Sequence, residues 1–378
     1  MMYGELGASR TRRTVTATAR LLRALHLDGM LLSGLVAVSV FGLFILYSAA
    51  GDNTALWFNQ LARLGIGFAV MIALAQVPDH FFRMLSPAAY ALGLLLLAVV
   101  AVAGDVGKGA QRWLDLGFVR FQPSEILKLG VPMMCAWYLY QRPLPPSLRD
   151  VAIMLLVVLV PALLIAEQPD LGTALLVAAA GLIVLVMGGL PWTYLLGGAA
   201  VVGAAVPLVW RFLMHDYQRQ RVLTLLDPQS DALGAGYHII QSQIAIGSGG
   251  VFGKGWTNGS QAQLEFLPER STDFIYAVIG EELGLLGLIA LLIGYLFIVG
   301  RGLYMATQCR DAFARLLSGS IALTFFVYAF VNAGMVTGLL PVVGVPLPLV
   351  SYGGTSFVTL MAGFGILMSL YSSRKLLG

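Results

Sequence analysis

Apolar runs of about 20 residues recur along the chain, and shorter polar segments separate them. A helix of that length crosses a bilayer core. The runs are continuous and do not alternate with period two, which predicts helices rather than a β-barrel. We predict ten spans, at residues 30–49, 57–77, 86–104, 124–141, 150–166, 171–188, 191–211, 273–300, 314–337 and 349–371.

One long polar segment, residues 212–272, interrupts this pattern between spans seven and eight. Within it, "YHIIQSQIAIG" predicts an amphipathic helix at the membrane surface, with an apolar stripe from Ile239 to Ile246. A structureless connection of this length is unusual and is usually functional. We therefore expect an all-α polytopic membrane protein with a single integral domain, residues 1–378, tails at 1–29 and 372–378, and this one large loop.

Composition and charge support the same class and add an orientation. The chain is 58% hydrophobic and 11% charged, whereas soluble domains carry about 25% charged residues. No CxxC or Cys/His cluster involves Cys135 or Cys309, so neither a disulfide framework nor a zinc site is predicted. By the positive-inside rule both termini are cytoplasmic. The basic residues on that side are Arg10, Arg12, Arg13, Arg20, Arg23, Arg83, Arg142, Arg149, Arg301, Arg310, Arg315, Arg374 and Lys375.

The longer connections on the other face carry basic residues as well, among them Arg112, Arg219, Arg221 and Lys254. Long translocated loops weigh little in the positive-inside rule, so the orientation stands. These cations indicate that something anionic binds on the outer face.

Glu125 and Lys128 begin the fourth span in "QPSEILKLG" and share a helix face at spacing i, i+3. One interpretation is a mutual ion pair that lets both charges enter the helix. The other is that the helix start favours the Glu125 carboxylate, which leaves Lys128 free to face a phosphate.

Asp273 lies in "EFLPERSTDFIYAV", directly before the eighth span. It is either a helix N-cap or a functional carboxylate at the membrane boundary. In a regular helix Glu281 lies about 80° and Glu282 about 180° around the axis from Asp273, so we interpret both glutamates as mainly structural.

Three further motifs each have two interpretations. In "EQPDLGTA", Asp170 caps a tight turn or contributes a functional carboxylate. In "PLPLVSYGGTS", with Ser351 and Thr355, Gly and Pro mark non-helical backbone that lines a cavity, or a helix simply starts at Pro346 or Pro348. "GSGGVFGKGW" is not a P-loop, although Lys254 and its flanking glycines suit an approach to phosphate.

Together these motifs resemble the SEDS family of shape, elongation, division and sporulation proteins, from about Asp105 to the C-terminus. "GSGGVFGKGW" and "LEFLPERSTDF" are closer to its elongation members than to its division members. The resemblance implies a peptidoglycan glycosyltransferase of the bacterial cytoplasmic (inner) membrane. It would polymerise lipid II at the outer leaflet and release undecaprenyl pyrophosphate. A class B penicillin-binding protein would be its partner.

The resemblance assigns the essential aspartate to Asp273 and the conserved pair of the fourth span to Glu125 and Lys128. Asp273 is then the candidate base for the attacking sugar hydroxyl. The expected substrate-binding residues are Glu125, Lys128, Arg112, Arg219, Arg221, Lys254, Asp170, Ser351 and Thr355. A divalent cation, Mg²⁺ or Mn²⁺, is a candidate cofactor, with Asp273 and Glu125 as candidate ligands, and no organic cofactor is expected.

Two other functions remain open at this point. A lipid II flippase needs a polar path through the membrane, and the inner halves of the spans offer few polar side chains. A scaffold that only activates its penicillin-binding partner leaves the outer carboxylates without a role.

Overall fold

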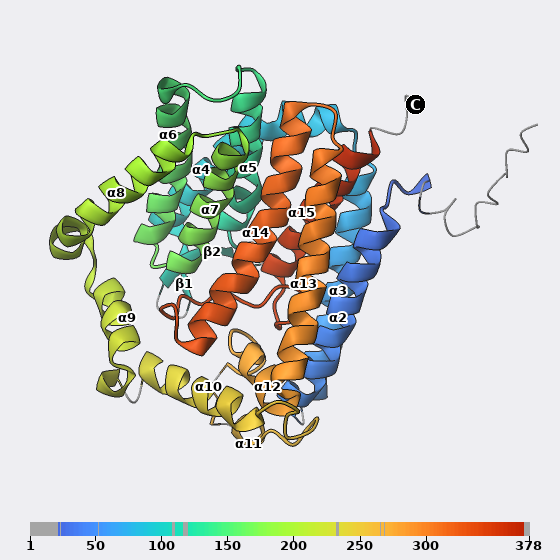
Figure 1. The fold of residues 1–378 in the computed structure, drawn as a ribbon, viewed down its shortest axis with the longest axis vertical. Coiled ribbons are helices and arrows are strands. Elements are labelled where there is room, and N and C mark those ends of the chain that lie inside the picture. Colours follow the sequence, from blue (N-terminus) through green and yellow to red (C-terminus); the bar gives the residue numbers. More distant parts are fainter. Residues whose placement is uncertain are drawn as a thin grey trace, which may run out of the picture.

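The computed structural model is a bundle of long, nearly parallel helices, with short helices across one end (Figure 1). It describes residues 22, 24–51, 53–107, 110–115, 120–231, 234–264, 266–267 and 269–373. Most of the expected tails, residues 1–29 and 372–378, therefore lie outside the described residues. The long helices are α2 (Gly29–Ala50), α3 (Thr54–Ala75), α4 (Asp79–Ala103), α5 (Ser124–Tyr140), α6 (Leu148–Glu167), α7 (Leu171–Met187), α8 (Trp192–Leu208), α13 (Gly284–Thr307), α14 (Ala312–Thr337) and α15 (Thr355–Ser372).

Eight of these helices are long and apolar enough to cross a membrane. The other two, α5 and α7, are 17 residues long and coincide with the fourth and sixth predicted spans. Every predicted span thus overlaps a helix, and the polytopic helical class is confirmed. Leucine, valine and phenylalanine side chains fill the core between the helices, with α14 the most enclosed of the eight.

The large loop is mostly helical and lies across one end of the bundle, which we call the loop face (Figure 1). It contains a π-turn (Val209–Leu213), α9 (Asp216–Leu226), a 3₁₀ turn (Pro228–Asp231), α10 (Ala235–Gly249) and α11 (Ser260–Gln263). The predicted amphipathic helix is α10, and it packs on protein as well. Ile239 is 1% exposed, and the Ser242 hydroxyl donates to the Val336 carbonyl at 2.7 Å.

The connection between α4 and α5 adds a small antiparallel sheet that the helical pattern did not predict. Its strands are β1 (Asp105–Gly107), β2 (Ala110–Asp115) and β3 (Arg120–Phe121), in the order β1-β2-β3. Asp105 pairs with Trp113, and Leu114 pairs with Phe121. The sheet lies at the loop face, where it carries Arg112 toward the start of α7.

The prediction of one continuous eighth span, residues 273–300, is wrong. The segment divides into α12 (Ile275–Glu282), which is only eight residues long, and α13, which is the span. Gly284 adopts φ +63°, and a Cβ there would lie 2.4 Å from the Gly253 nitrogen. The chain reverses at Gly284 because glycine alone fits this close, left-handed position.

The tenth span also begins later than predicted. Helix α15 starts at Thr355 rather than at residue 349, and residues 341–347 have no regular structure. The alternative of a helix start at Pro346 or Pro348 is therefore wrong, and the interpretation of "PLPLVSYGGTS" as largely non-helical backbone is confirmed.

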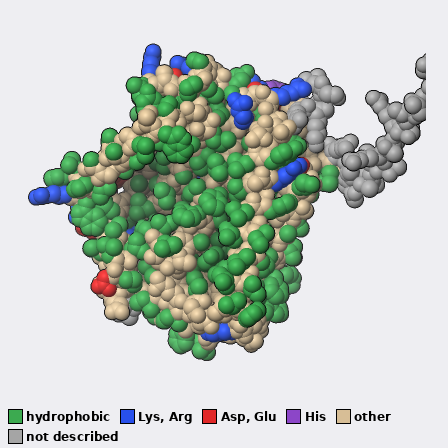
Figure 2. Space-filling model, in the orientation of Figure 1, with side chains coloured by type: hydrophobic (Ala, Val, Ile, Leu, Met, Phe, Trp, Pro, Cys, Tyr) green, Lys and Arg blue, Asp and Glu red, His purple; other side chains and the backbone are tan. Residues whose placement is uncertain are grey.

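Helix α8 stands apart from the bundle (Figure 1), and none of its residues is buried. Figure 2 shows a hollow between this arm and the main body, bordered by hydrophobic side chains. A π-turn at Val209–Leu213 ends the helix and redirects the chain into α9.

Candidate functional site

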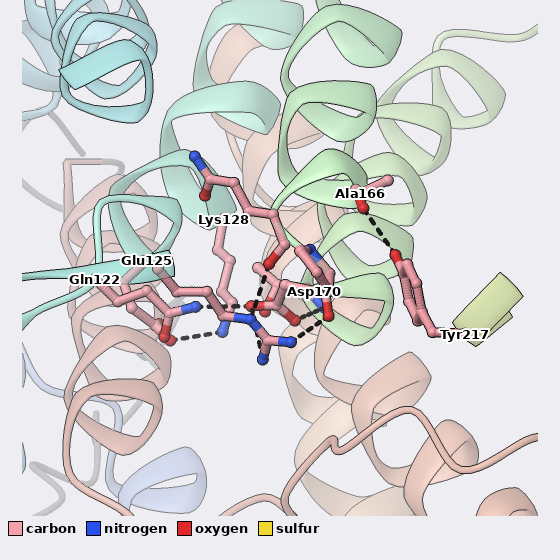
Figure 3. Close-up of polar contacts among 10 residues, drawn as sticks. Gln122, Glu125, Lys128, Ala166, Asp170 and Tyr217 are labelled. Carbon is pink, nitrogen blue, oxygen red and sulfur yellow. Dashed lines mark hydrogen bonds and ion pairs between the residues drawn. The ribbon is translucent and has the colours of Figure 1, made fainter. Parts of the chain in front are cut away.

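Lys128 and Glu125 are buried together in the first turns of α5 (Figure 3). The Lys128 Nζ lies 2.7 Å from Glu125 Oε1, and the side chains are 7% and 5% exposed. Of the two interpretations, the mutual ion pair is therefore confirmed, and a Lys128 free of Glu125 is wrong. The second oxygen, Glu125 Oε2, is buried and has no hydrogen-bond partner among the described residues. The Lys128 ammonium also lies 5.5 Å from the ring centre of Tyr328 in α14.

Asp170 joins the start of α7 to the sheet. Its Oδ1 accepts a hydrogen bond from the Thr173 nitrogen at 3.1 Å, so Asp170 is the N-cap that was one of its two interpretations. Its Oδ2 accepts from Gln122 Nε2 at 2.8 Å and lies 4.0 Å from Arg112 Nη1. Arg112 also donates to the carbonyls of Gln168 and Pro169. One carboxylate therefore both caps a helix and holds a cation.

Arg221 reaches this cluster from α9. The Tyr217 hydroxyl donates to the Ala166 carbonyl at 2.9 Å and fastens α9 to the end of α6 (Figure 3). Burial, and then the neighbouring Arg112 guanidinium, lower the pKa of Arg221. Its Nη1 is buried without a hydrogen-bond partner among the described residues. Two guanidinium groups beside one carboxylate leave positive charge that suits an anionic ligand.

Asp273 lies in a turn, residues 271–273, which we call the Asp273 turn. Helix α12 has Phe274, not Asp273, at its N-cap position, and no side chain caps it. The alternative that Asp273 is the N-cap is therefore wrong. Asp273 is partly exposed, and a Cβ on Gly344 would lie 3.5 Å from its Oδ2.

All three carbonyl groups of the Asp273 turn are held by distant parts of the chain. The Tyr352 nitrogen donates to Ser271 O at 2.8 Å, and the Ser351 hydroxyl donates to Thr272 O at 2.5 Å. Asn332 Nδ2 in α14 donates to Asp273 O at 2.8 Å and to Val345 O at 2.7 Å. Ser351 thus positions the turn, whereas Thr355 begins α15 and its carbonyl accepts from Thr359.

These groups meet although they are far apart in sequence. Tyr328, beside Lys128, and Asn332, bonded to the Asp273 turn, are one helical turn apart on α14, where side chains are about 5–6 Å apart. On the other side, a Cβ on Gly172 of α7 would lie 2.7 Å from Val343 O, next to Gly344. The structure therefore brings the Lys128 pair, the Asp170 cluster and the Asp273 turn to one region.

Lys254 and Arg219 have other bonding partners. Lys254 Nζ lies 2.7 Å from Oε1 of Glu281, which is fully buried and also accepts from Ser260 and from the Gln261 and Ala262 nitrogens. Arg219 donates to the carbonyls of Trp210 and Arg211 and so secures the bend between α8 and α9.

The glycine-rich segment around Lys254, residues 249–255, forms what we call the clasp. The nitrogens of Lys254 and Gly255 donate to the carbonyls of Glu281 and Glu282, both at 3.0 Å. The Ser48 hydroxyl donates to Glu282 at 2.5 Å, so both glutamates are structural, as predicted. The backbone donors expected to approach a phosphate are engaged by α12.

Three residues of this region were missed in the sequence: Gln60, Arg63 and Asn332. Gln60 and Arg63, one turn apart on α3, touch the segment that holds the Asp273 turn. Gln60 is hydrogen-bonded to Ser351 O and to the Gly353 nitrogen, and the Arg63 guanidinium lies 4.2 Å from the ring centre of Tyr352. Polar side chains inside apolar spans are rare and usually functional, which was the available signal.

Comparisons with known proteins show which chains this one is similar to. The profile of the cell cycle protein family FTSW_RODA_SPOVE matches residues 21–376. Peptidoglycan glycosyltransferase MrdB of Escherichia coli strain K12 is 52% identical over 352 residues, which cover 93% of this chain and 95% of that protein.

Two solved structures are similar over nearly the whole chain. The first is described as "Structural coordination of polymerization and crosslinking by a peptidoglycan synthase complex"; it has a TM-score of 0.80 and 36% identity, and the match covers 92% of this chain and 98% of that chain. The second is the Rod shape determining protein RodA of Thermus thermophilus, with a TM-score of 0.70 and 30% identity, covering 92% of this chain and 97% of that chain.

Proposed function

The chain belongs to the cell cycle protein family FTSW_RODA_SPOVE, and on this premise we propose that it is a peptidoglycan glycosyltransferase. It polymerises lipid II into glycan strands during cell elongation and releases undecaprenyl pyrophosphate. The observation that carries the proposal is the meeting in one region of a partly exposed carboxylate, Asp273, with the cations Lys128, Arg112 and Arg221. Neither a flippase nor a scaffold needs that pairing.

In the proposed reaction, the 4-hydroxyl oxygen of one sugar attacks the anomeric carbon of another. The new carbon–oxygen bond forms as the bond to the lipid pyrophosphate breaks, and Asp273 takes the hydroxyl proton. Lys128, Arg112 and Arg221 stabilise the charge that develops on the leaving pyrophosphate. Lys254 and Arg219 are left out of this step because of where they are bonded: Lys254 pairs with Glu281 at the far end of α12 from Asp273, and Arg219 donates to carbonyls at the bend between α8 and α9.

We further propose that any divalent cation, Mg²⁺ or Mn²⁺, enters with the substrate. No group of three or more His, Cys, Asp or Glu side chains gathers as metal ligands in the part of the chain that the structure describes. Mg²⁺ is commonly held by one or two carboxylates together with substrate phosphates. Glu125, with its unpartnered Oε2, and Asp273 suit that arrangement. When bound, the cation would neutralise charge on the pyrophosphate.

We propose that the loop face is extracytoplasmic and that both termini lie in the cytoplasm, with the protein in the bacterial inner membrane. The arginines of the connections on the opposite face, Arg83, Arg142, Arg310 and Arg315 among them, support this orientation. The partner we propose is a class B penicillin-binding protein that crosslinks the strands. The complex with which this chain shares its fold, described by its polymerization and crosslinking, supports that partner.

The test is to incubate the purified protein, alone and with its partner, with lipid II and to resolve the products. We expect Asp273→Asn to lower polymer formation by at least about 100-fold, the usual contribution of a general base. Glu282→Gln, which changes a buried carboxylate at the other end of α12, should retain activity. Full polymerisation by Asp273→Asn would refute the catalytic role, and lipid II translocation without polymer would favour a transporter.

A further inference from the structure

A polar cavity of about 410 Å³ opens beside the Asp273 turn, at the loop-face ends of α2 and α3. Its lining includes Gly51, Asn53, Leu56, Gln263, Arg270 and Ser271. Ser271 is the first residue of the Asp273 turn. The cavity therefore touches the segment that carries the proposed base, and none of the cations assigned above to the pyrophosphate lines it.

The cavity and the cation cluster lie on different sides of α12, the helix that follows the Asp273 turn. In Figure 1 the loop-face ends of α2 and α3 lie to the right of α12, whereas β2 and α7 lie to its left. The turn itself is bonded to Tyr352 and Asn332. A base in this position can serve one ligand while the other side holds a second.

The lining chemistry selects a class of ligand. Amide groups of Asn53 and Gln263 and the Ser271 hydroxyl provide neutral donors and acceptors, the groups that pair with sugar hydroxyl and acetamido groups. Arg270 adds one positive charge and extends toward the end of α2, since a Cβ on Gly51 would lie 3.6 Å from its Nη2. Asn53 Oδ1 accepts from the Leu56 nitrogen and Gln263 Nε2 donates to Ser48 O, and a lipid tail would place the remaining donors and acceptors of these side chains against hydrocarbon, which is costly.

We propose that this cavity binds the saccharide–peptide headgroup of the acceptor, the substrate whose 4-hydroxyl attacks. This inference rests on the proposed glycosyltransferase function and adds which side of Asp273 each substrate occupies. The acceptor loses no pyrophosphate during the reaction, so it needs few cations, and Arg270 is the cation among the described residues that line the cavity. The donor, whose leaving group is a pyrophosphate, belongs with Lys128, Arg112 and Arg221.

Two variants of the full-length protein test the site. Gln263→Trp fills the cavity from an exposed position, and we expect it to raise the half-saturating lipid II concentration at least tenfold. Asn53→Asp keeps the N-cap of α3, because Asp caps as well as Asn, but places a negative charge beside the peptide carboxylates. A rise of about threefold is expected there, since exposed charges interact weakly. Gln229→Trp, at an exposed position in the 3₁₀ turn, is the matched control and should leave the half-saturating lipid II concentration unchanged.

A lipid-free disaccharide pentapeptide separates acceptor from donor, because it carries a 4-hydroxyl but no leaving group. At millimolar concentration it should slow polymerisation by the wild type and lose at least tenfold of its potency against Gln263→Trp. Absence of competition in the wild type would overturn the inference, as would an unchanged half-saturating concentration in a folded Gln263→Trp variant. Wild-type protein that makes no polymer at all would instead refute the proposed function.

Discussion

The two ends of α12 are held in contrasting ways. At its C-terminal end, the clasp donates backbone nitrogens to the last carbonyls of the helix, and Lys254 neutralises the fully buried Glu281. At its N-terminal end, two side chains and one backbone nitrogen hold the Asp273 turn. The clasp encloses its carboxylates, whereas the turn leaves Asp273 partly exposed.

This difference indicates a division of labour within one short helix. A carboxylate that is surrounded by donors stabilises the fold but has no open side for a substrate. A carboxylate whose backbone is fixed and whose side chain stays partly exposed keeps a defined position within reach of a substrate. We therefore expect changes at the turn to lower turnover and changes at the clasp to lower stability.

The largest effect is expected from Asn332→Leu, which removes the amide that holds Asp273 O and Val345 O. Small misplacement of a catalytic group costs on the order of 100-fold in rate, so we expect kcat to fall about 100-fold while KM changes little. The measurement is steady-state polymerisation of lipid II at a temperature where the variant is folded.

Thr324→Val is the matched control for Asn332→Leu. Thr324 is also buried in α14, and its hydroxyl has no hydrogen-bond partner among the described residues. Its replacement should leave kcat within about threefold of the wild type, which corresponds to a change of less than about 1 kcal/mol in activation free energy. Equal losses in both variants would mean that α14 is merely sensitive to change.

A smaller effect, on stability rather than on turnover, is expected from Lys254→Met, which leaves the buried Glu281 carboxylate without its cation. Removing one partner of a buried pair costs about 3–5 kcal/mol, and the partial exposure of Lys254 reduces this to about 2 kcal/mol. Thermal unfolding should report the loss, while turnover per folded molecule stays near that of the wild type. Lys254→Arg should restore stability. If Lys254→Met is stable but loses turnover, Lys254 binds substrate, and its role as a structural partner of Glu281 is refuted.

The smallest effect concerns His238 of α10, whose ring stacks on Phe274 with centroids 5.4 Å apart. Burial lowers the pKa of His238, while the facing carboxylates Glu269 and Asp231 oppose that shift. The unfolded chain therefore binds a proton more readily, and stability falls as pH drops below the ordinary value of about 6.5.

Between pH 7.5 and pH 5.5 we expect the wild type to lose about 1–2 °C more in melting temperature than His238→Gln. Thermal unfolding of both proteins at the two pH values measures this difference. Identical losses would show that the titration of His238 does not contribute.

Much of the fold could be predicted from the apolar pattern, because a membrane-spanning helix forms its own backbone hydrogen bonds and needs a continuous run of apolar residues. The break of the eighth span did not follow from hydropathy. "IYAVIGEELGLLGL" reads as one helix, and only the contact between Gly284 and the clasp reverses the chain there. Such a contact joins residues far apart in sequence and leaves little trace in local periodicity.

The site was predicted unevenly for a related reason. Asp170 and the Glu125–Lys128 pair act within one or two turns of their own helices, so local spacing predicted their contacts. The partners of Lys254 and the roles of Gln60 and Asn332 depend on how separate helices meet. For Asp273 the local sequence supports a helix cap and a catalytic carboxylate equally, and only the family resemblance distinguishes the two.

Helix α8, with no buried residue, has a consequence for the choice of membrane. A helix with no buried residue takes much of its tilt from the lipid, and a mismatch between its apolar length and the bilayer thickness is relieved by tilting. The π-turn that follows it, a kind of irregularity found often at functional sites, joins this tilt to α9 and Arg221. Bilayer thickness would then set the width of the hollow beside α8, so the same protein would work at different rates in short-chain and long-chain lipids.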